Sequence, residues 1–225
     1  NSIFRVYMVK INSKFSKVYF LLFAILIHSF CSYSQSNFSP KTYGNVSNYF
    51  TDTTDMQNFF KFKSGQTVAE VGTYDAQNLI GFSTFTDHIN YYAQDINASQ
   101  LNDKKLLKRV NKTNPGLGNG NTIQVVIGKL DETLLPDNYF DKIILVSTFH
   151  EFTEMEAMIT DIHSKLRTAG KLYILETTCL SPGHINYSAE EAKGIIEPNG
   201  FKMIRQDERE LNESDGLYRQ IYIKK

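Results

Sequence analysis

This sequence has little cysteine and lacks tryptophan. Its 225 residues include two cysteines, Cys31 and Cys179, and no tryptophan. Two cysteines are too few for a structural zinc cage. Excess charge is missing too, because 24 basic and 24 acidic residues cancel and the basic ones form no dense run. This balance gives no electrostatic reason to expect nucleic acid or an anionic membrane surface as a partner.

Several short motifs with well-known chemistry are also absent. The sequence has no Gly-x-Ser-x-Gly turn for a serine nucleophile and no Gly-Lys-Ser/Thr loop for a phosphate group. Its five histidines are scattered without the spacing of a metal site, so we expect no bound metal. The lack of Gly-x-Gly-x-x-Gly argues against a nicotinamide-dependent oxidoreductase.

The first 34 residues differ from the rest. Four basic residues and no acidic residue precede an apolar run at 18–27, and small residues follow at Ser32 and Ser34. This order is typical of a secretory signal peptide, so we predict that residues 1–34 are removed and that the protein is exported, periplasmic or secreted. The apolar run is too short to span a bilayer comfortably, so we expect no stable membrane span after cleavage. The alternative is a membrane anchor formed by an uncleaved N-terminal segment.

The mature chain is of a size that suits one domain. We expect residues 35–46 to be a flexible segment and residues 47–225 to form the domain. Cleavage would leave Cys179 as the only cysteine, so no intrachain disulfide could form. The oligomeric state is not indicated by the sequence.

Strand-like and helix-like segments alternate through this domain. The alternation predicts a parallel sheet with helices on both faces. Strands are predicted at 67–71, 89–93, 123–127, 140–146 and 169–175, and helices at 76–85, 99–110, from 153 and from 188. The last two strands, 201–205 and 217–224, have no helix between them and should pair antiparallel. The sequence therefore predicts an α/β, Rossmann-like fold with a seven-stranded, mostly parallel sheet and an antiparallel last strand.

Two sequence patterns predict where helices begin. Thr153 is followed three residues later by Glu156, and Ser188 by Glu191. A Ser or Thr with an acidic residue at this distance forms a capping box, in which each side chain bonds to the other's backbone N–H. We therefore expect helix N-termini at Thr153 and Ser188.

The segment after the first predicted strand carries a partly kept glycine pattern. It reads Glu-Val-Gly-Thr-Tyr-Asp-Ala over 70–76, with Gly72 kept and with Tyr74 and Ala76 in place of further glycines. Glycines in such a turn let the backbone bend sharply against a ligand. Asp95 ends the second strand, where dinucleotide-binding folds place an acidic residue on the ribose hydroxyls.

These segments, with Gly-Lys-Leu-Asp-Glu-Thr-Leu-Leu-Pro over 128–136, resemble the class I S-adenosylmethionine-dependent methyltransferases. The resemblance covers roughly residues 60–225. Many members of that family have an acidic residue where this chain has Lys129. The resemblance implies S-adenosylmethionine as the cofactor and the following cofactor-binding residues: Glu70, Gly72, Thr73, Tyr74, Asp95, Ile96, Lys129 and Leu130.

The loops after the fourth and fifth strands are similar to those of a narrower subgroup of this family, with Phe-His-Glu at 149–151 and Pro-Gly-His at 182–184. The resemblance implies methyl transfer to an unidentified small-molecule acceptor. A second hypothesis is an exported, non-catalytic binding module with a degenerate cofactor site. Two arguments favour it. S-adenosylmethionine is made in the cytosol, whereas the predicted signal peptide would export this domain from it. In addition, two glycines of the motif are replaced.

Three side chains are candidates for the catalytic residues: His150, Glu176 and His184. All three follow the fourth and fifth strands, and open α/β sheets bind ligands at the carboxyl ends of their strands. We expect His150 to face the methyl group as a base or as a substrate-orienting residue, since its ordinary pKa suits proton transfer near neutral pH. His184 should close over the substrate. Glu151 should point to the opposite face, because neighbouring residues on a strand alternate.

Overall fold

The computed structural model describes residues 38–178, 185–210 and 216–225. Its internal contacts divide the chain into Asn1–Phe38 and a compact unit, Ser39–Lys225. The predicted signal peptide and His184 lie outside the described residues. The helices and strands of the second unit form the sheet and the candidate site.

Three short helices precede the sheet: α2 (Pro40–Tyr43), η1 (Gly44–Tyr49) and α3 (Thr53–Phe60). We expected residues 35–46 to be flexible, but Tyr43 and Val46 in this segment are buried. The ring of Tyr43 packs against Phe85 with centroids 6.3 Å apart, and the Val46 N–H donates to the Asn78 side chain at 3.0 Å. The packed unit therefore begins at Ser39 rather than at residue 47.

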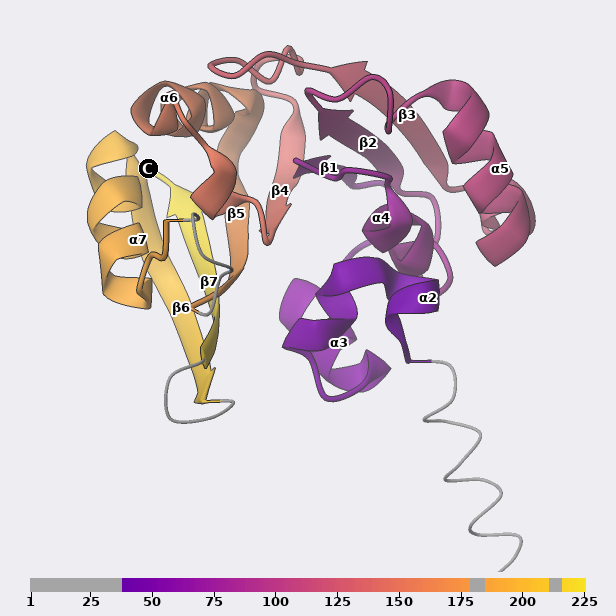
Figure 1. Cartoon of the computed structure of the whole chain (residues 1–225), viewed down its shortest axis with the longest axis horizontal. Coiled ribbons are helices and arrows are strands. Elements are labelled where there is room, and N and C mark those ends of the chain that lie inside the picture. Colours follow the sequence, from indigo (N-terminus) through magenta and orange to yellow (C-terminus); the bar gives the residue numbers. More distant parts are fainter. Residues whose placement is uncertain (1–37, 179–184, 211–215) are drawn as a thin grey trace, which may run out of the picture. The chain divides into compact units, whose positions relative to one another are not determined.

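A seven-stranded sheet forms the centre of the unit, in the order β3-β2-β1-β4-β5-β7-β6 (Figure 1). The strands are β1 (Thr67–Val71), β2 (Asn90–Asp95), β3 (Thr122–Ile127), β4 (Phe140–Val146), β5 (Leu166–Thr177), β6 (Phe201–Glu210) and β7 (Gly216–Lys224). The first five strands pair in parallel. Strand β7 is antiparallel to both of its neighbours, β5 and β6. The predicted fold, including the antiparallel last strand, is confirmed.

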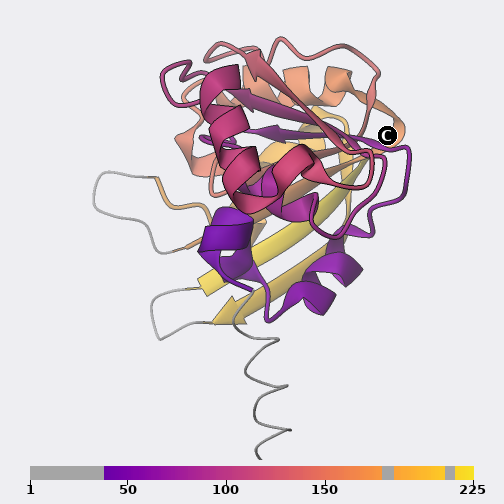
Figure 2. The ribbon, with the colours of Figure 1, turned by 90° about the vertical axis from the view of Figure 1, so that its right-hand side faces the viewer.

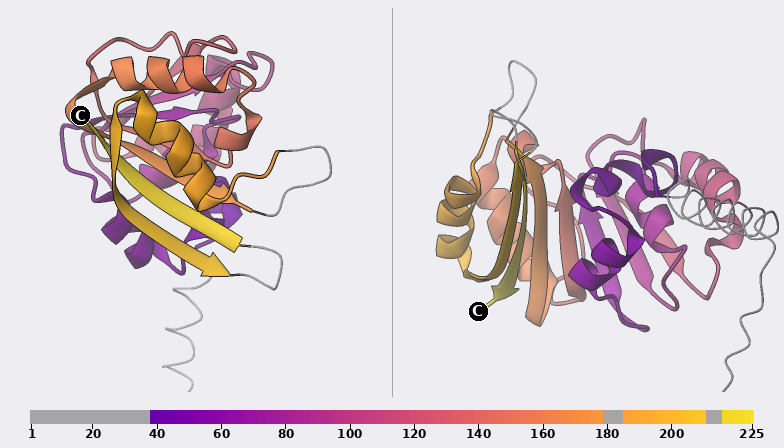
Figure 3. Two further views of the ribbon diagram at one scale, coloured as in Figure 1. Left: turned by 90° about the vertical axis from the view of Figure 1, so that its left-hand side faces the viewer. Right: turned by 90° about the horizontal axis from the view of Figure 1, so that it is seen from below.

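Helices cover both faces of the sheet. They are α4 (Gln77–Phe82), α5 (Asp103–Thr113), α6 (Met155–Lys165) and α7 (Ala189–Ile196), with short turns η2 (Pro115–Leu117), η3 (Phe149–Glu151) and η4 (Glu197–Asn199). Figure 2 shows α4 and α5 with the N-terminal helices on one face, and Figure 3 shows α6 and α7 on the other. None of the described helices is long and apolar enough to cross a membrane.

Each face has its own apolar core. On the face of α6 and α7, Ile143, Leu172 and Ile174 of the sheet pack with Ile159 and Ala192 of the helices. The other face is aromatic, with ring centroids 4.9–6.3 Å apart among Phe60, Phe62, Phe82, Tyr91 and Tyr173. Strands β1 and β4 are buried along their whole length; for β4 this agrees with its apolar run, which favours a strand buried on both faces.

One of the two predicted capping boxes forms. Ser188 and Glu191 bond to each other's backbone N–H at the start of α7. The predicted capping box at Thr153 is wrong, because α6 begins at Met155. The N-cap of α6 is Glu154, and no side chain caps this helix. Glu156 is therefore the second helical residue instead of the third, one position too early for the box. The turn η3 occupies residues 149–151 directly after β4, ahead of this helix start.

Candidate functional site

The loop after β1 has an unusual backbone conformation. Gly72, Tyr74 and Ala76 have φ angles of 72°, 54° and 63°, in a region that costs an ordinary residue about 1–2 kcal/mol. These are the three positions at which the methyltransferase pattern has glycine. Tyr74 and Ala76 therefore adopt a left-handed conformation that glycine would adopt without strain. Backbone strain that is kept in this way points to a functional requirement for the loop.

Gly72 is the one position of the three where a side chain has no room. A Cβ atom at this position would overlap the side chain of Thr148 at the end of β4. The Thr148 hydroxyl also donates to the Gly72 carbonyl at 3.1 Å. The backbone of the loop therefore lies directly against the end of β4, which only glycine permits.

Asp95, at the end of β2, is fixed by two backbone groups. One carboxylate oxygen accepts from the Tyr74 N–H at 2.7 Å, and the other accepts from the Asn97 N–H at 2.8 Å. Each oxygen keeps a further lone pair for a ligand hydroxyl. The carboxylate is therefore held in place beside the strained loop, with acceptor capacity left over.

Glu70 is a buried carboxyl group underneath the same loop. It accepts from the Thr73 hydroxyl at 2.5 Å and from the Asn78 side-chain amide. Burial raises the pKa of Glu70 to about 7; these two hydrogen bonds oppose the rise, and the charges of Asp75 and Asp95 add to it. Because Asn78 also bonds to the backbone of η1, Glu70 links the loop to the N-terminal helices.

A cavity of about 410 Å³ opens at the carboxyl ends of β1, β2 and β4. Of the eight predicted cofactor-binding residues, six line it: Gly72, Tyr74, Asp95, Ile96, Lys129 and Leu130. Tyr74, Ile96 and Leu130 are more than half exposed, so their apolar surface is free to meet a ligand. Glu70 and Thr73 are buried underneath. The Lys129 amine pairs with Glu132 at 2.9 Å.

The other end of the cavity is formed by residues that follow β4. Sequence reasoning did not single out Ser147, Thr148, Phe152 and Met158, which all line it. Ser147 has a φ of 51°, and its hydroxyl lies 2.6 Å from the Tyr49 hydroxyl of η1. No sequence pattern marks a serine for such a conformation, since glycine and asparagine are the usual residues in it.

His150 lies between two carboxylates at this end. Its Nδ1 atom is 2.9 Å from Glu176 Oε1, and its Nε2 atom is 3.0 Å from Glu151 Oε1. The Glu176 carboxylate, which is fully buried, also accepts from the backbone N–H of Thr177 at 3.1 Å. Burial favours the neutral ring, but the hydrogen bond and charge of Glu176 and the charge of Glu151 outweigh it and raise the pKa of His150.

The structure places His150 and Glu151 differently from the prediction. Glu151 lines the cavity, and its side chain is 55% exposed, whereas that of His150 is 6% exposed. The reason is that residues 149–151 form the turn η3 rather than an extension of β4, so the alternation of a strand does not apply. His150 and Glu176 are brought together as expected at the edge of the sheet, but behind Glu151.

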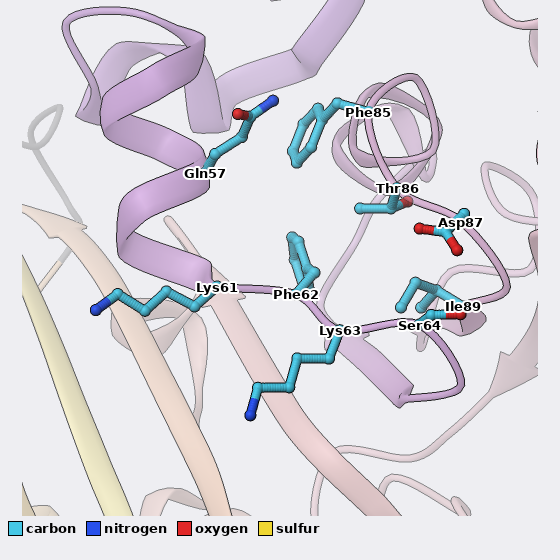
Figure 4. A pocket seen from close by; sticks show the side chains of 9 residues that line it. All are labelled: Gln57, Lys61, Phe62, Lys63, Ser64, Phe85, Thr86, Asp87 and Ile89. Carbon is cyan, nitrogen blue, oxygen red and sulfur yellow. The ribbon is translucent and has the colours of Figure 1, made fainter.

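A second cavity, of about 210 Å³, lies at the start of β1 and β2, the opposite edge of the sheet. Phe62 and Phe85 face it, while the side chains of Lys61 and Lys63 extend away (Figure 4). None of the predicted site residues lines it. Among the described residues, no group of three or more His, Cys, Asp or Glu side chains is placed to hold a metal ion.

The chain is similar to known methyltransferases in sequence and in fold. Residues 70–174 match the family model described as a methyltransferase domain. No curated protein sequence matches the chain. A SAM-dependent methyltransferase from Aquifex aeolicus superposes with a TM-score of 0.61 and 22% identity, over 84% of this chain and 97% of that one.

Two further solved structures share the fold. Phosphoethanolamine N-methyltransferase 2 of Haemonchus contortus, in complex with S-adenosyl-L-methionine, has a TM-score of 0.59 and 12% identity, over 82% of this chain and 56% of that one. The [4+2]-cyclase SpnF has a TM-score of 0.61 and 13% identity, over 73% of this chain and 77% of that one. The fold is therefore that of S-adenosylmethionine-dependent methyltransferases.

Proposed function

We propose that this chain is an S-adenosylmethionine-dependent methyltransferase that acts on a small-molecule acceptor. The observation that carries the proposal is the loop after β1, which keeps left-handed backbone conformations at Tyr74 and Ala76. A chain released from cofactor binding would gain stability by relaxing this strain. The methyltransferase model that matches residues 70–174 supports the same function.

The residues around the cavity fit the parts of S-adenosylmethionine. The backbone of Gly72 and Tyr74 would lie against the amino-acid part, and Asp95 would accept hydrogen bonds from the ribose hydroxyls. The apolar side chains of Ile96 and Leu130 would flank the adenine. The bound cofactor supplies a methyl group on a sulfonium, and transfer requires an acceptor atom aligned with that carbon, so positioning contributes much of the rate.

Calorimetry with S-adenosylhomocysteine tests this assignment. We expect binding to the wild type, and Asp95→Ala should weaken it about tenfold or more, since a charge-assisted hydrogen bond contributes about 1.5–3 kcal/mol. Asp87→Ala, at an exposed position on the opposite edge of the sheet, is the matched control and should bind like the wild type. Unfolding curves of both variants establish that each is folded.

A non-catalytic, exported binding module is the second candidate. The loss of two motif glycines favours it. Absence of S-adenosylhomocysteine binding to the wild type at millimolar concentration would favour this module over the enzyme.

We also propose that the protein is exported, with residues 1–34 as its signal peptide. The basic segment, the apolar run at 18–27 and the small residues before Gln35 support this. Mass spectrometry of the protein from its native host should find Gln35 at the N-terminus. A mature protein that keeps the apolar run would instead favour the membrane anchor.

A further inference from the structure

The sheet order fixes which residues can meet the methyl group. Asp95 ends β2, Gly72 follows β1, and the next strand in the sheet is β4. A cofactor held by Asp95 at its ribose and by the loop after β1 at its amino-acid part would present its methyl group to residues that follow β4. The cavity continues in that direction to Glu151 and Phe152.

Glu151 is the only ionisable side chain among the described residues that line this end of the cavity. One of its oxygens lies 3.0 Å from His150 Nε2, and the other ring nitrogen of His150 is held by Glu176 at 2.9 Å. The side chains become more buried along this row, from 55% exposed at Glu151 to 6% at His150 and 0% at Glu176. A buried pair thus holds one carboxylate at the cavity surface.

The backbone strengthens this arrangement. The N–H groups of Thr177 and His150 both point at the Glu176 carboxylate, at 3.1 and 3.4 Å. Buried carboxylates that accept several hydrogen bonds have few alternative rotamers, because each alternative leaves donors unpaired. These bonds restrain the orientation of the His150 ring, whose Nε2 atom contacts Glu151.

We propose that Glu151 is the catalytic carboxylate that receives the acceptor's proton, that His150 and Glu176 are its positioning residues, and that the acceptor is a nitrogen or oxygen nucleophile bearing a hydrogen. This inference rests on the proposed methyltransferase function. It replaces His150 by Glu151 as the group that faces the methyl acceptor.

The reaction balances as a direct displacement. A lone pair of the acceptor nitrogen or oxygen forms a bond to the methyl carbon, and the carbon–sulfur bond breaks with its electron pair left on sulfur. The positive charge moves from sulfur to the acceptor atom, whose proton passes to Glu151 and then to water. A carboxylate beside the acceptor stabilises the positive charge that develops there.

The same carboxylate restricts the acceptor class. A carboxylic acid or phosphate acceptor would bring a second negative charge next to Glu151, which is unfavourable in a partly buried site. Phe152 and Met158 supply the apolar part of this wall. The expected acceptor is therefore a small amine or alcohol with an apolar portion.

Sinefungin, the analogue with an amine-bearing carbon in place of the methylsulfonium, is the direct probe. Its ammonium group should pair with Glu151, whereas S-adenosylhomocysteine presents no group there. By calorimetry we expect Glu151→Gln to weaken sinefungin binding about tenfold, with S-adenosylhomocysteine binding unchanged. Glu154→Gln, at an exposed position three residues further on that does not line the cavity, is the matched control and should change neither.

The positioning role of His150 is tested by the ratio of the affinities for sinefungin and S-adenosylhomocysteine. His150→Ala should lower the preference for sinefungin as Glu151→Gln does, since Glu151 loses its fixed orientation. His150→Gln, whose amide can donate to Glu151, should restore part of the preference. A merely structural role of His150 would move both affinities together and leave the ratio unchanged.

The outcomes separate this inference from the proposed function. If S-adenosylhomocysteine does not bind the wild type, the proposed methyltransferase function and the role of Glu151 are both overturned. If it binds and Glu151→Gln leaves the sinefungin preference intact, the role of Glu151 alone is overturned. Assays with methyl-labelled S-adenosylmethionine and separate pools of amines, alcohols and carboxylic acids check the acceptor class. Methylation confined to the acid pool would contradict the inference.

Discussion

The β1–β2 end of the cavity is shaped mainly by backbone conformation, whereas the β4–β5 end is shaped by side chains that hold one another. The first end depends on the φ angles of the loop 72–76 and on one anchored carboxylate, Asp95. The second depends on a row of three ionisable side chains that are progressively buried: Glu151, His150 and Glu176. The two ends belong to one cavity but tolerate sequence change differently.

This difference explains how Tyr74 and Ala76 can stand in place of glycines while the loop has positive φ angles at both positions. Backbone atoms are the same in every residue, so Tyr74 and Ala76 keep the shape at a cost of about 1–2 kcal/mol each. At the other end a replaced side chain would leave a buried partner unpaired. We expect the β1–β2 end to accept substitutions that keep φ, and the β4–β5 end to accept very few.

The largest effect should come where the two ends touch. Gly72→Ala would place a methyl group into Thr148; overpacking costs about 1–3 kcal/mol, and the left-handed φ adds about 1–2 kcal/mol. Gly65→Ala is the control, because Gly65 also has a positive φ but has nothing within 4 Å. Urea unfolding should show a loss of stability for Gly72→Ala that is about two to three times larger. Equal losses would mean that the contact with Thr148 does not restrict the loop.

Glu70→Gln should stabilise the protein at pH 8. The pKa of Glu70 is raised to about 7 in the folded state, so the folded protein retains a proton that the unfolded chain releases. Wild-type stability therefore falls as the pH rises from about 4.5 to 7. Glutamine does not titrate, and it keeps both partners because the Thr73 hydroxyl can accept as well as donate. The gain should approach about 3 kcal/mol at pH 8 and vanish below pH 4.5.

Denaturant titrations at pH 4.5, 6 and 8 measure this difference. A gain of equal size at all three pH values would show that the ionisation of Glu70 is not its source. These titrations are done on protein free of S-adenosylhomocysteine, because a positively charged ligand group near Glu70 would lower the pKa of Glu70.

At the opposite end, Glu176→Gln should destabilise the fold by about 1.5–3 kcal/mol, the contribution of a hydrogen bond between charged groups. Glu176 contributes to the raised pKa of His150, and the stability that comes from a raised histidine pKa is fully present below about pH 6.5 and is lost as the pH rises through the folded pKa. The destabilisation should therefore be greatest in mild acid.

The ring protons of His150, followed by NMR, provide an independent measurement. The pKa of His150 should fall in Glu176→Gln and stay unchanged in Glu154→Gln, whose side chain lies outside the row. An unchanged His150 titration in Glu176→Gln would show that Glu176 is not its charged partner.

The smallest effect should come from Tyr74. Its side chain is 57% exposed, so Tyr74→Ala removes little packing and keeps the strained φ, whereas Tyr74→Gly relieves the strain. We expect the glycine variant to be about 1 kcal/mol more stable than the alanine variant, the strain relief being partly offset by the flexibility of glycine in the unfolded chain. If the Tyr74→Ala variant is as stable as the Tyr74→Gly variant or more stable, the left-handed conformation at this position is not strained.

Sequence reasoning reached most of the fold and half of the site. The strands at 67–71 and 140–146 were predicted with the observed bounds of β1 and β4; for β4 the reason is that a strand buried on both faces leaves a continuous apolar signal. The six predicted residues that line the cavity came from a family pattern whose spacing is set by the strands. The predicted helix start at Thr153 was wrong, because a capping pattern is a local signal; α6 begins at Met155.

The sequence by itself determined the alternation of strands and helices, the antiparallel last strand and the position of Asp95 at a strand end. These follow from periodicity and from the order of elements along the chain, which are local properties. Only the tertiary structure decided that Glu151 faces the cavity and that His150 is enclosed between Glu151 and Glu176. Glu151 and Glu176 are 25 positions apart in the sequence, and their relation to His150 depends on a three-residue turn and on the pairing of β4 with β5.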